Sequence, residues 1–287
     1  MPSFITHQLI AEDIYQALPD NEKNKIQDFS CYYLGAQGPD PFFVYMPFTK
    51  KKENLGKLIH RQKVYGFFSS AKEYIEFNGL DYSYMLGFIT HYAVDTLFHP
   101  YVYALTYELK KDLSKYKKGE NPHFLIEKDL DCFFFEEYRK GKATNYQYPI
   151  SASDRACSKI YHLLSAVTWD NFSVRLDREG LFSALKRFVR HQKMTKDKHG
   201  FKRAIISGLE KALFLPNSLS YFFPRRHPDL SFTNYKREKT VYSPNGLSVF
   251  DLYEQSITLS IKLIKDFLSD KPLPENHFST DMNTGKQ

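Results

Sequence analysis

The sequence predicts an all-α protein, built as one compact multi-helix domain. Apolar residues recur at three- and four-residue spacing through most of the chain, which is the period of an amphipathic helix. No internal repeat is visible, and no β-rich block is large enough to form a second domain. With 287 residues, 42% of them hydrophobic, the chain can bury a full core without disulfide bonds. We therefore expect one helical domain over residues 1–270, followed by a loose polar tail over 271–287.

The first predicted helix covers residues 5–18. Its apolar residues follow one another at three- and four-residue spacing, and Pro19 ends the run because proline cannot continue a helix. A loop rich in Gly and Pro is expected at 35–41. Two prolines flank Asp40 in this loop, so the local backbone is restricted and the carboxylate is held in a fixed direction.

Two more helices are predicted at 55–77 and 82–99. The second is apolar on nearly every side, which is typical of a helix at the centre of a protein. Pro100 follows this helix directly. We therefore expect the helix to end at His99, which leaves that side chain some freedom to turn.

The second half of the chain is predicted to continue as helices. Asn121-Pro122 is a strong helix start, with Asn as the N-cap and Pro at the first helical position, and this helix runs through Tyr138. Residues 224–246 are expected to be irregular because turn-forming residues cluster there. Further amphipathic helices are predicted at about 153–168, 180–192, 201–214 and 250–268.

The cysteine pattern and the amino terminus indicate the cellular compartment of the protein. Cys31, Cys132 and Cys157 are scattered, with no C-x-x-C pair, which argues against a disulfide scaffold and against a thiolate zinc site. We expect free core thiols in a reducing compartment. The amino terminus lacks the pattern of a secretory leader, and no stretch is long and apolar enough to span a bilayer. A cytoplasmic protein without stable membrane insertion is therefore expected.

The charge balance favours anionic partners. Lys and Arg number 40 against 33 acidic residues, a formal net charge of +7. Nucleic acid, acidic lipid and phosphate esters would all be attracted by such an excess. A solvated basic surface with no specific partner has the same composition, so charge alone does not choose among these alternatives.

The chemistry is carried by the placement of histidines rather than by their number. His91, Asp95 and His99 recur every four residues in the apolar 82–99 helix. This spacing puts three potential metal ligands on one helix face, with neighbouring Cβ atoms about 5–6 Å apart. Unpaired polar groups on a buried helix cost several kcal/mol, so these side chains need partners, and a metal ion supplies them.

A second pair with the same spacing lies on the first turn of the helix that starts at Asn121-Pro122. His123 and Glu127 offer an imidazole and a carboxylate, which are ligands that zinc accepts. Three such ligands per ion, shared between two helices, would make a two-metal site. The triple spacing and the second pair together favour metal binding, whereas a single His-x-x-x-Asp pair is more often a hydrogen-bonded pair.

The other candidate residues are ordinary when taken one at a time. His7 and His60 each have the pattern of a structural histidine, and Asp40 between its prolines is able simply to cap a turn. The remaining five histidines show no partner pattern and are expected to be structural or surface residues: His162, His191, His199, His227 and His277.

Taken together, these residues resemble the zinc-dependent phospholipases C. The matching motifs occur in the order of that family: Thr6-His7, Gly38-Pro39-Asp40-Pro41, His60, His91-x-x-x-Asp95, His99 and His123-x-x-x-Glu127. The motifs cover the first half of the chain, and the helical second half is compatible with them. Their order, residue types and spacing make the resemblance specific, although no single motif would.

The resemblance implies a helical, zinc-dependent phosphodiester hydrolase. It implies three groups of zinc ligands: His60, His91 and Asp95 with Asp40; His99, His123 and Glu127; and His7 with a bridging Asp95. Asp40 is also implied as a candidate general base. Zinc lowers the pKa of bound water from 15.7 to about 7, so a metal-bound hydroxide would attack phosphorus at neutral pH, and paired ions would stabilise the charge that develops.

The chain departs from the family in two respects. Family members use the amino group of an N-terminal Trp as a zinc ligand, whereas the only Trp here is Trp169, so both two and three ions are open. Within these 287 residues we expect no counterpart of the membrane-binding β-sandwich of toxin members. A phospholipid substrate is implied by the family and not by these residues.

Four other classes of protein share parts of this pattern. Single-strand-specific zinc nucleases share the helical three-zinc architecture, so nucleic acid stays open as a substrate. A non-catalytic metal-binding helical protein is also open, and a closed coordination sphere would distinguish it. A di-iron protein needs paired Glu-x-x-His motifs, and an HD-type phosphohydrolase needs a contiguous His-Asp. The chain has neither feature.

Overall fold

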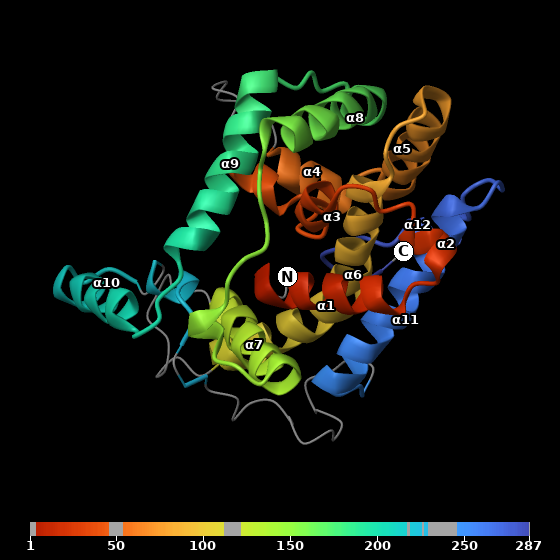
Figure 1. Ribbon diagram of the computed structural model, residues 1–287. Coiled ribbons are helices and arrows are strands. Elements are labelled where there is room, and N and C mark those ends of the chain that lie inside the picture. The colour runs from red at the N-terminus through yellow and green to blue at the C-terminus, as the bar shows by residue number, and fades with distance from the viewer. Residues whose placement is uncertain are drawn as a thin grey trace.

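The computed structural model describes residues 4–45, 54–111, 122–216, 219–225, 227–228 and 246–286. These parts of the chain contain helices and connecting segments but no β-strand, and the predicted all-α fold is confirmed (Figure 1). The first elements are α1 (Phe4–Ala17), α2 (Asp20–Lys23), α3 (Phe29–Gly35), the 3-10 helix η1 (Asp40–Val44), α4 (Leu55–Arg61) and α5 (Val64–Asn78). Next come α6 (Ser83–Lys111), α7 (Pro122–Arg139), η2 (Ala143–Asn145) and α8 (Asp154–Phe172). The last are α9 (Arg178–Met194), α10 (Phe201–Ala212), η3 (Ser220–Phe222), α11 (Val249–Leu268) and α12 (Glu275–Phe278).

The helix α6 runs through the middle of the molecule, as its apolar character predicts. Helices α1, α3, α7 and α11 pack against it from different sides (Figure 1). The contact with α3 is made at glycines. A Cβ on Gly87 would lie 2.0 Å from the carbonyl oxygen of Tyr32, and one on Gly35 would lie 2.0 Å from that of Tyr84. The backbones of α3 and α6 therefore touch, and this contact brings the chain after α3 close to the polar face of α6.

The predicted helix at 55–77 is two helices. Helix α4 ends at Arg61, and Lys63 adopts a left-handed backbone conformation (φ 48°) before α5 begins at Val64. The break has a packing reason. It lets α4 bury His60 while α5 turns its own apolar face to the core, and each helix buries a separate side.

The predicted end of the central helix at His99 is wrong. Helix α6 continues through Pro100 to Lys111. A proline inside a helix removes a backbone hydrogen bond and crowds the preceding turn. Here the side chains of Tyr101, Val102 and Leu105, beyond the proline, are fully buried, and this packing offsets the local cost.

The expectation of a loose polar tail is also wrong for residues 271–286. Phe278 and Met282 are fully buried, and the Phe278 ring lies 4.9 Å from that of Phe68. The backbone N–H of Met282 donates to the carbonyl of His60 at 3.2 Å. The segment therefore belongs to the core, because two apolar side chains among its polar residues are enough to anchor it.

The other predicted elements agree within a few residues. Helix α7 begins at Pro122, while Asn121 lies outside the described residues, as does most of the predicted irregular segment 224–246. The predicted C-terminal helices correspond to α8, α9, α10 and α11. No helix in the described part of the chain is long and apolar enough to cross a bilayer. The three cysteines are free and buried.

Candidate metal centre

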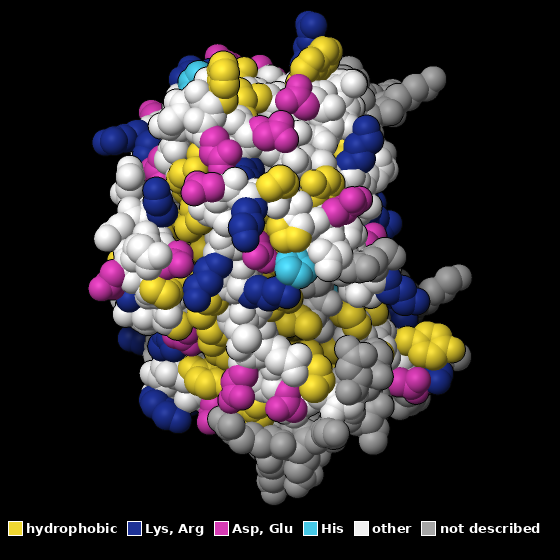
Figure 2. Space-filling view, turned by 90° about the vertical axis from the view of Figure 1, so that its right-hand side faces the viewer, with side chains coloured by type: hydrophobic (Ala, Val, Ile, Leu, Met, Phe, Trp, Pro, Cys, Tyr) yellow, Lys and Arg dark blue, Asp and Glu magenta, His cyan; other side chains and the backbone are white. Residues whose placement is uncertain are grey.

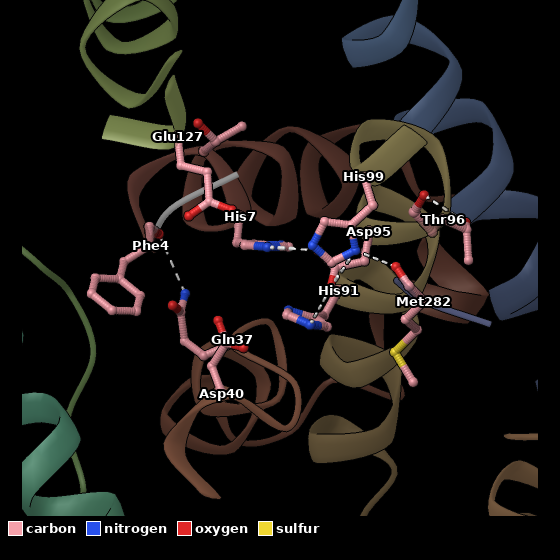
Figure 3. Close-up of polar contacts among 12 residues, drawn as sticks. Phe4, His7, Gln37, Asp40, His91, Asp95, Thr96, His99, Glu127 and Met282 are labelled. Carbon is pink, nitrogen blue, oxygen red and sulfur yellow. Dashed lines mark hydrogen bonds and ion pairs between the residues drawn. The ribbon is translucent and has the colours of Figure 1, made fainter. Parts of the chain in front are cut away.

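The structure brings the eight predicted residues together from five elements. Each element contributes side chains that point toward one shared interior space, as Figure 3 shows for several of them. The residues are His7 on α1, Asp40 on η1, His60 on α4, His91, Asp95 and His99 on α6, and His123 and Glu127 on α7. All are buried except His123, which is partly exposed.

These side chains form three groups that would each suit a metal ion. Within every group the potential ligand atoms lie within 4.8 Å of one another. The groups are His7, His91 and Asp95; Asp40, His60 and His91; and His99, His123 and Glu127. His91 belongs to two of them, so the first two groups adjoin.

Asp95 lies at the centre of the arrangement. Its Oδ1 is 3.3 Å from Nε2 of His7, and its Oδ2 is 3.0 Å from Nε2 of His91. The same Oδ2 is 3.5 Å from Nε2 of His60 and 3.9 Å from Nδ1 of His99. One fully buried carboxylate therefore faces four imidazoles, and its two oxygens are directed to different neighbours.

The donors fit zinc. Both carboxylate oxygens of Asp40 and Asp95 are buried without a hydrogen-bond partner, and so are Nε2 of His7, His60 and His91. Buried polar atoms without partners are rare in folded proteins because each one costs free energy. Imidazole nitrogen and carboxylate oxygen are the donors that zinc takes in sites without thiolate. A group of cations among these atoms would satisfy all of them.

Two histidines are oriented by backbone carbonyls. Nδ1 of His60 lies 2.6 Å from the carbonyl of Gly56, and Nδ1 of His99 is hydrogen-bonded to the carbonyl of Met282. A carbonyl only accepts, so Nδ1 carries the proton in both rings. The lone pair is then on Nε2, as in histidines that ligate metals in other proteins.

The charges of the site are set by burial and by the neighbouring rings. Burial lowers the pKa of His91 to about 4 and that of His99 to about 3, so both rings are neutral at pH 7. Burial alone would raise the pKa of Glu127, but His123 holds it at about 2. Burial and the negative charge of Asp95 raise the pKa of Asp40 well above its ordinary value. The neutral rings of His91 and His99 are in the state that a cation requires, whereas binding of a cation would displace the proton that the raised pKa of Asp40 favours.

Asp131 ties α1 to α7. Its Oδ1 accepts hydrogen bonds of 2.8 Å from both the backbone N–H and the hydroxyl of Thr6. These N–H groups at the start of a helix have no partner within the helix, and the carboxylate supplies one. The contact positions His7, the next residue, relative to the α7 helix that carries Glu127.

Gly38 leaves room for the His91 ring, a role that the sequence patterns did not assign to it. Its backbone has φ +53°, and a Cβ there would lie 2.2 to 2.6 Å from atoms of the His91 ring. The sequence did offer a sign of this role, since Gly38 is the first residue of the Gly38-Pro39-Asp40-Pro41 motif. The contribution of Met282 had no such signal, because it is made by a backbone carbonyl that any residue offers.

A helical fold with clustered imidazole and carboxylate donors defines a class of metal-binding helical protein, and a comparison with protein families identifies the family. The profile described as zinc dependent phospholipase C matches residues 6–187. This range spans more than half of the chain and includes all eight residues. The chain therefore belongs to the zinc-dependent phospholipase C family. Comparisons with curated proteins and with solved structures return no match.

Proposed function

We propose that the protein is a zinc-dependent phosphodiester hydrolase of the phospholipase C type. The observation that carries this proposal is the position of Asp95, whose two oxygens face four imidazoles drawn from three helices. A single buried carboxylate shared in this way suits adjacent cations. Two or three zinc ions would be held by the three groups that contain His7, Asp40, His60, His91, Asp95, His99, His123 and Glu127.

The residues suit hydrolysis at phosphorus. When bound, zinc supplies a Lewis acid that neutralises charge on the phosphoryl oxygens and makes a water molecule acidic. Asp40 is the candidate general base because the family resemblance assigns it that role, and its buried carboxylate lies 3.7 Å from Nε2 of His60 within one of the three ligand groups. The water oxygen would bond to phosphorus, the bond from phosphorus to the glycerol oxygen would break, and the proton would pass to that oxygen. The products would be a diacylglycerol and a phosphorylated head group.

The surroundings of the group formed by His99, His123 and Glu127 suit an apolar or aromatic part of a substrate. The Tyr103 ring lies 4.9 Å from His123 and is 42% exposed, and the neighbouring Phe124 is 41% exposed. An acyl chain and a nucleobase would both pack on such rings. The experiment therefore has to offer both kinds of substrate.

The test is hydrolysis by zinc-loaded, full-length protein. The substrates are a short-chain phosphatidylcholine below its micelle concentration and a single-stranded oligonucleotide. We expect release of phosphocholine, and we expect a chelator to abolish it. Asp40→Asn should lower kcat by at least about a hundredfold, while the exposed Asp170→Asn, a matched control, should leave kcat unchanged.

Each other outcome has a definite meaning. Cleavage of the oligonucleotide alone would assign the site to a nuclease-type phosphodiesterase. Zinc-loaded protein that cleaves neither substrate would overturn the proposal in favour of a non-catalytic metal site. Full activity after removal of all metal would exclude the zinc chemistry altogether.

A further inference from the structure

Helix α10 packs with its polar side inward. The buried carboxylate of Glu210 accepts hydrogen bonds from the backbone N–H groups of Leu219 at 2.7 Å and Ser220 at 3.4 Å. The guanidinium of Arg203 donates to the carbonyls of Ser220 at 2.9 Å and Phe223 at 2.6 Å. Glu210 is the one side chain of α10 that is fully buried. Polar contacts therefore hold this helix, which is the reverse of an ordinary amphipathic surface helix.

The apolar side of α10 faces solvent. Phe201, Ile205 and Leu209 are 69%, 63% and 56% exposed, and their four-residue spacing places them along one side of the helix. Two residues after the helix extend this side, Leu213 and Phe214, at 65% and 91% exposure. We call these five residues the apolar stripe. The helix projects from the edge of the molecule (Figure 1), so the stripe is accessible to a large partner.

The excess charge of the chain falls in the segment that runs from the second half of α9 to the residue before the end of α10. Residues 186–211 hold nine Lys or Arg and two acidic residues, a net of +7 that equals the formal charge of the whole chain. Both acids, Asp197 and Glu210, are buried. Eight of the nine basic side chains are exposed and form what we call the basic rim: Lys186, Arg187, Arg190, Lys193, Lys196, Lys198, Lys202 and Lys211.

The opposite part of the surface has a different character. Figure 2 shows the face around α5 and α11, where basic and acidic side chains alternate and the apolar ones are scattered. This is the ordinary surface of a soluble domain. The apolar stripe and the basic rim are therefore a local feature of α9 and α10, and not a property of the whole surface.

We propose that the apolar stripe and the basic rim dock this protein on the surface of an anionic phospholipid bilayer. A helix with an apolar side and a predominantly basic border lies in the plane of a membrane, with its apolar side chains among the acyl chains and its cations at the lipid phosphates. Three of the five stripe residues are aliphatic, which suits acyl chains better than the stacked bases of a nucleic acid. The docking is peripheral and spans nothing.

This surface is joined to the candidate metal centre by packed aromatic rings. The Phe222 ring of η3, the element that anchors α10, lies 5.6 Å from that of Phe124 on α7. Phe124 follows His123 directly, and the rings of these two residues are 5.9 Å apart. A docked α10 would therefore hold the α7 ligand group near the lipid. That use of docking rests on the proposed hydrolase function, whereas the binding to lipid does not.

The test is flotation of the zinc-loaded, full-length protein with vesicles, in the cold and with the lipid analysed afterwards to show that it is intact. We expect binding to vesicles of phosphatidylcholine with phosphatidylserine, weakening as salt is raised, and little binding to pure phosphatidylcholine. The double variant Ile205→Gln, Leu209→Gln should weaken binding by at least about tenfold. Phe77→Gln, which removes a 91% exposed ring on α5, is the control and should bind normally.

A second pair of variants separates the effect of the basic rim on binding from the effect of the total charge of the protein. Lys193→Glu, Lys198→Glu and Lys211→Glu should together abolish binding, whereas the same reversal at three exposed lysines elsewhere, Lys110, Lys142 and Lys265, should weaken it much less. Equal losses would overturn the proposal, because total charge alone would then explain binding. Absence of vesicle binding would also overturn the proposal. So would self-association of the wild type that the double variant Ile205→Gln, Leu209→Gln relieves, because the apolar stripe would then be an interface between copies of the chain.

The activity assay keeps the two proposals apart. Hydrolysis of the monomeric short-chain substrate should be the same in the stripe variants and the wild type, because α10 contributes no residue to the candidate metal centre. Vesicle binding without hydrolysis would leave the docking surface intact and remove the proposed function. Hydrolysis without vesicle binding would do the reverse.

Discussion

The backbone carbonyl of Met282 accepts a hydrogen bond from Nδ1 of His99, across 183 positions of the sequence. This contact fixes the proton on Nδ1 and leaves Nε2 of His99 as the donor for the group that includes His123 and Glu127. The C-terminal segment is thus part of the candidate metal centre. Its anchoring in the core should therefore influence metal binding as well as stability.

Truncation of a buried ring in this segment tests that coupling. Phe278→Ala should lower the free energy of unfolding by about 3–5 kcal/mol, because Phe278 is fully buried against Phe68. It should also reduce zinc content by loosening the contact between Met282 and His99. Urea unfolding and elemental analysis measure the two effects. The control is Phe77→Ala, at a 91% exposed ring, which should change stability by less than about 0.5 kcal/mol; a comparable loss in both variants would contradict the prediction.

The contact of Gly38 with His91 can be isolated by a matched pair of glycines. Gly38 and Gly79 have nearly the same backbone conformation, with φ +53° and +59°, but a Cβ meets the His91 ring only at Gly38. Alanine at either position should cost about 1–2 kcal/mol from the left-handed backbone alone. Only Gly38→Ala should also displace His91 and lower zinc content, as measured by elemental analysis. Full zinc content in Gly38→Ala would show that the ring is not held this way.

Because the carboxylate of Asp95 is shared among several imidazoles, we expect a small change at this side chain to cause a large loss of zinc. Asp95→Asn keeps the shape of the side chain but removes the charge that faces four imidazoles. We expect the chelator-free wild type to carry two or three zinc ions and the variant to lose most of them. The fall in melting temperature on chelation should shrink in parallel, since that fall reports the bound metal. Asp170→Asn, at an exposed position, serves as the control, and unchanged zinc in Asp95→Asn would rule out the bridging role.

The buried neutral histidines predict a pH dependence for the metal-free protein. Burial lowers the pKa of His91 to about 4 and that of His99 to about 3, from 6.5. Between pH 6.5 and about 4 the unfolded chain therefore binds two protons that the native state does not, and stability falls as pH falls. Asp40 opposes this trend, because its raised pKa lets the native state keep a proton that the unfolded chain has lost.

The difference between variants isolates the two histidines. In the chelated protein, the double variant His91→Gln, His99→Gln should lose less stability than the wild type between pH 6.5 and about 5. His162→Gln, at an exposed histidine, should follow the wild type. Urea midpoints at the two pH values measure the effect. Parallel curves for the double variant and the wild type would count against buried neutral rings.

The sequence by itself determined the all-helical class and which potential ligands share one helix face. Helix geometry alone places His91, Asp95 and His99 on one face, and the same rule pairs His123 with Glu127. Hydrophobic period located α1, the start of α6 and the later helices within a few residues, because that period reports which side of a helix is buried. The family resemblance then supplied the expectation that His7, Asp40 and His60 belong with them, and the structure places all eight side chains together.

The tertiary structure decided what depends on contacts between distant segments. Pro100 does not end α6, because buried side chains beyond it outweigh a local preference, and the polar tail is anchored by Phe278 and Met282. Helix α10 was predicted as amphipathic, yet only its neighbours decide that the polar side faces inward. Periodicity records that a helix has two unlike sides. Which side meets the protein and which meets solvent is decided by long-range packing, which leaves no local mark in the sequence.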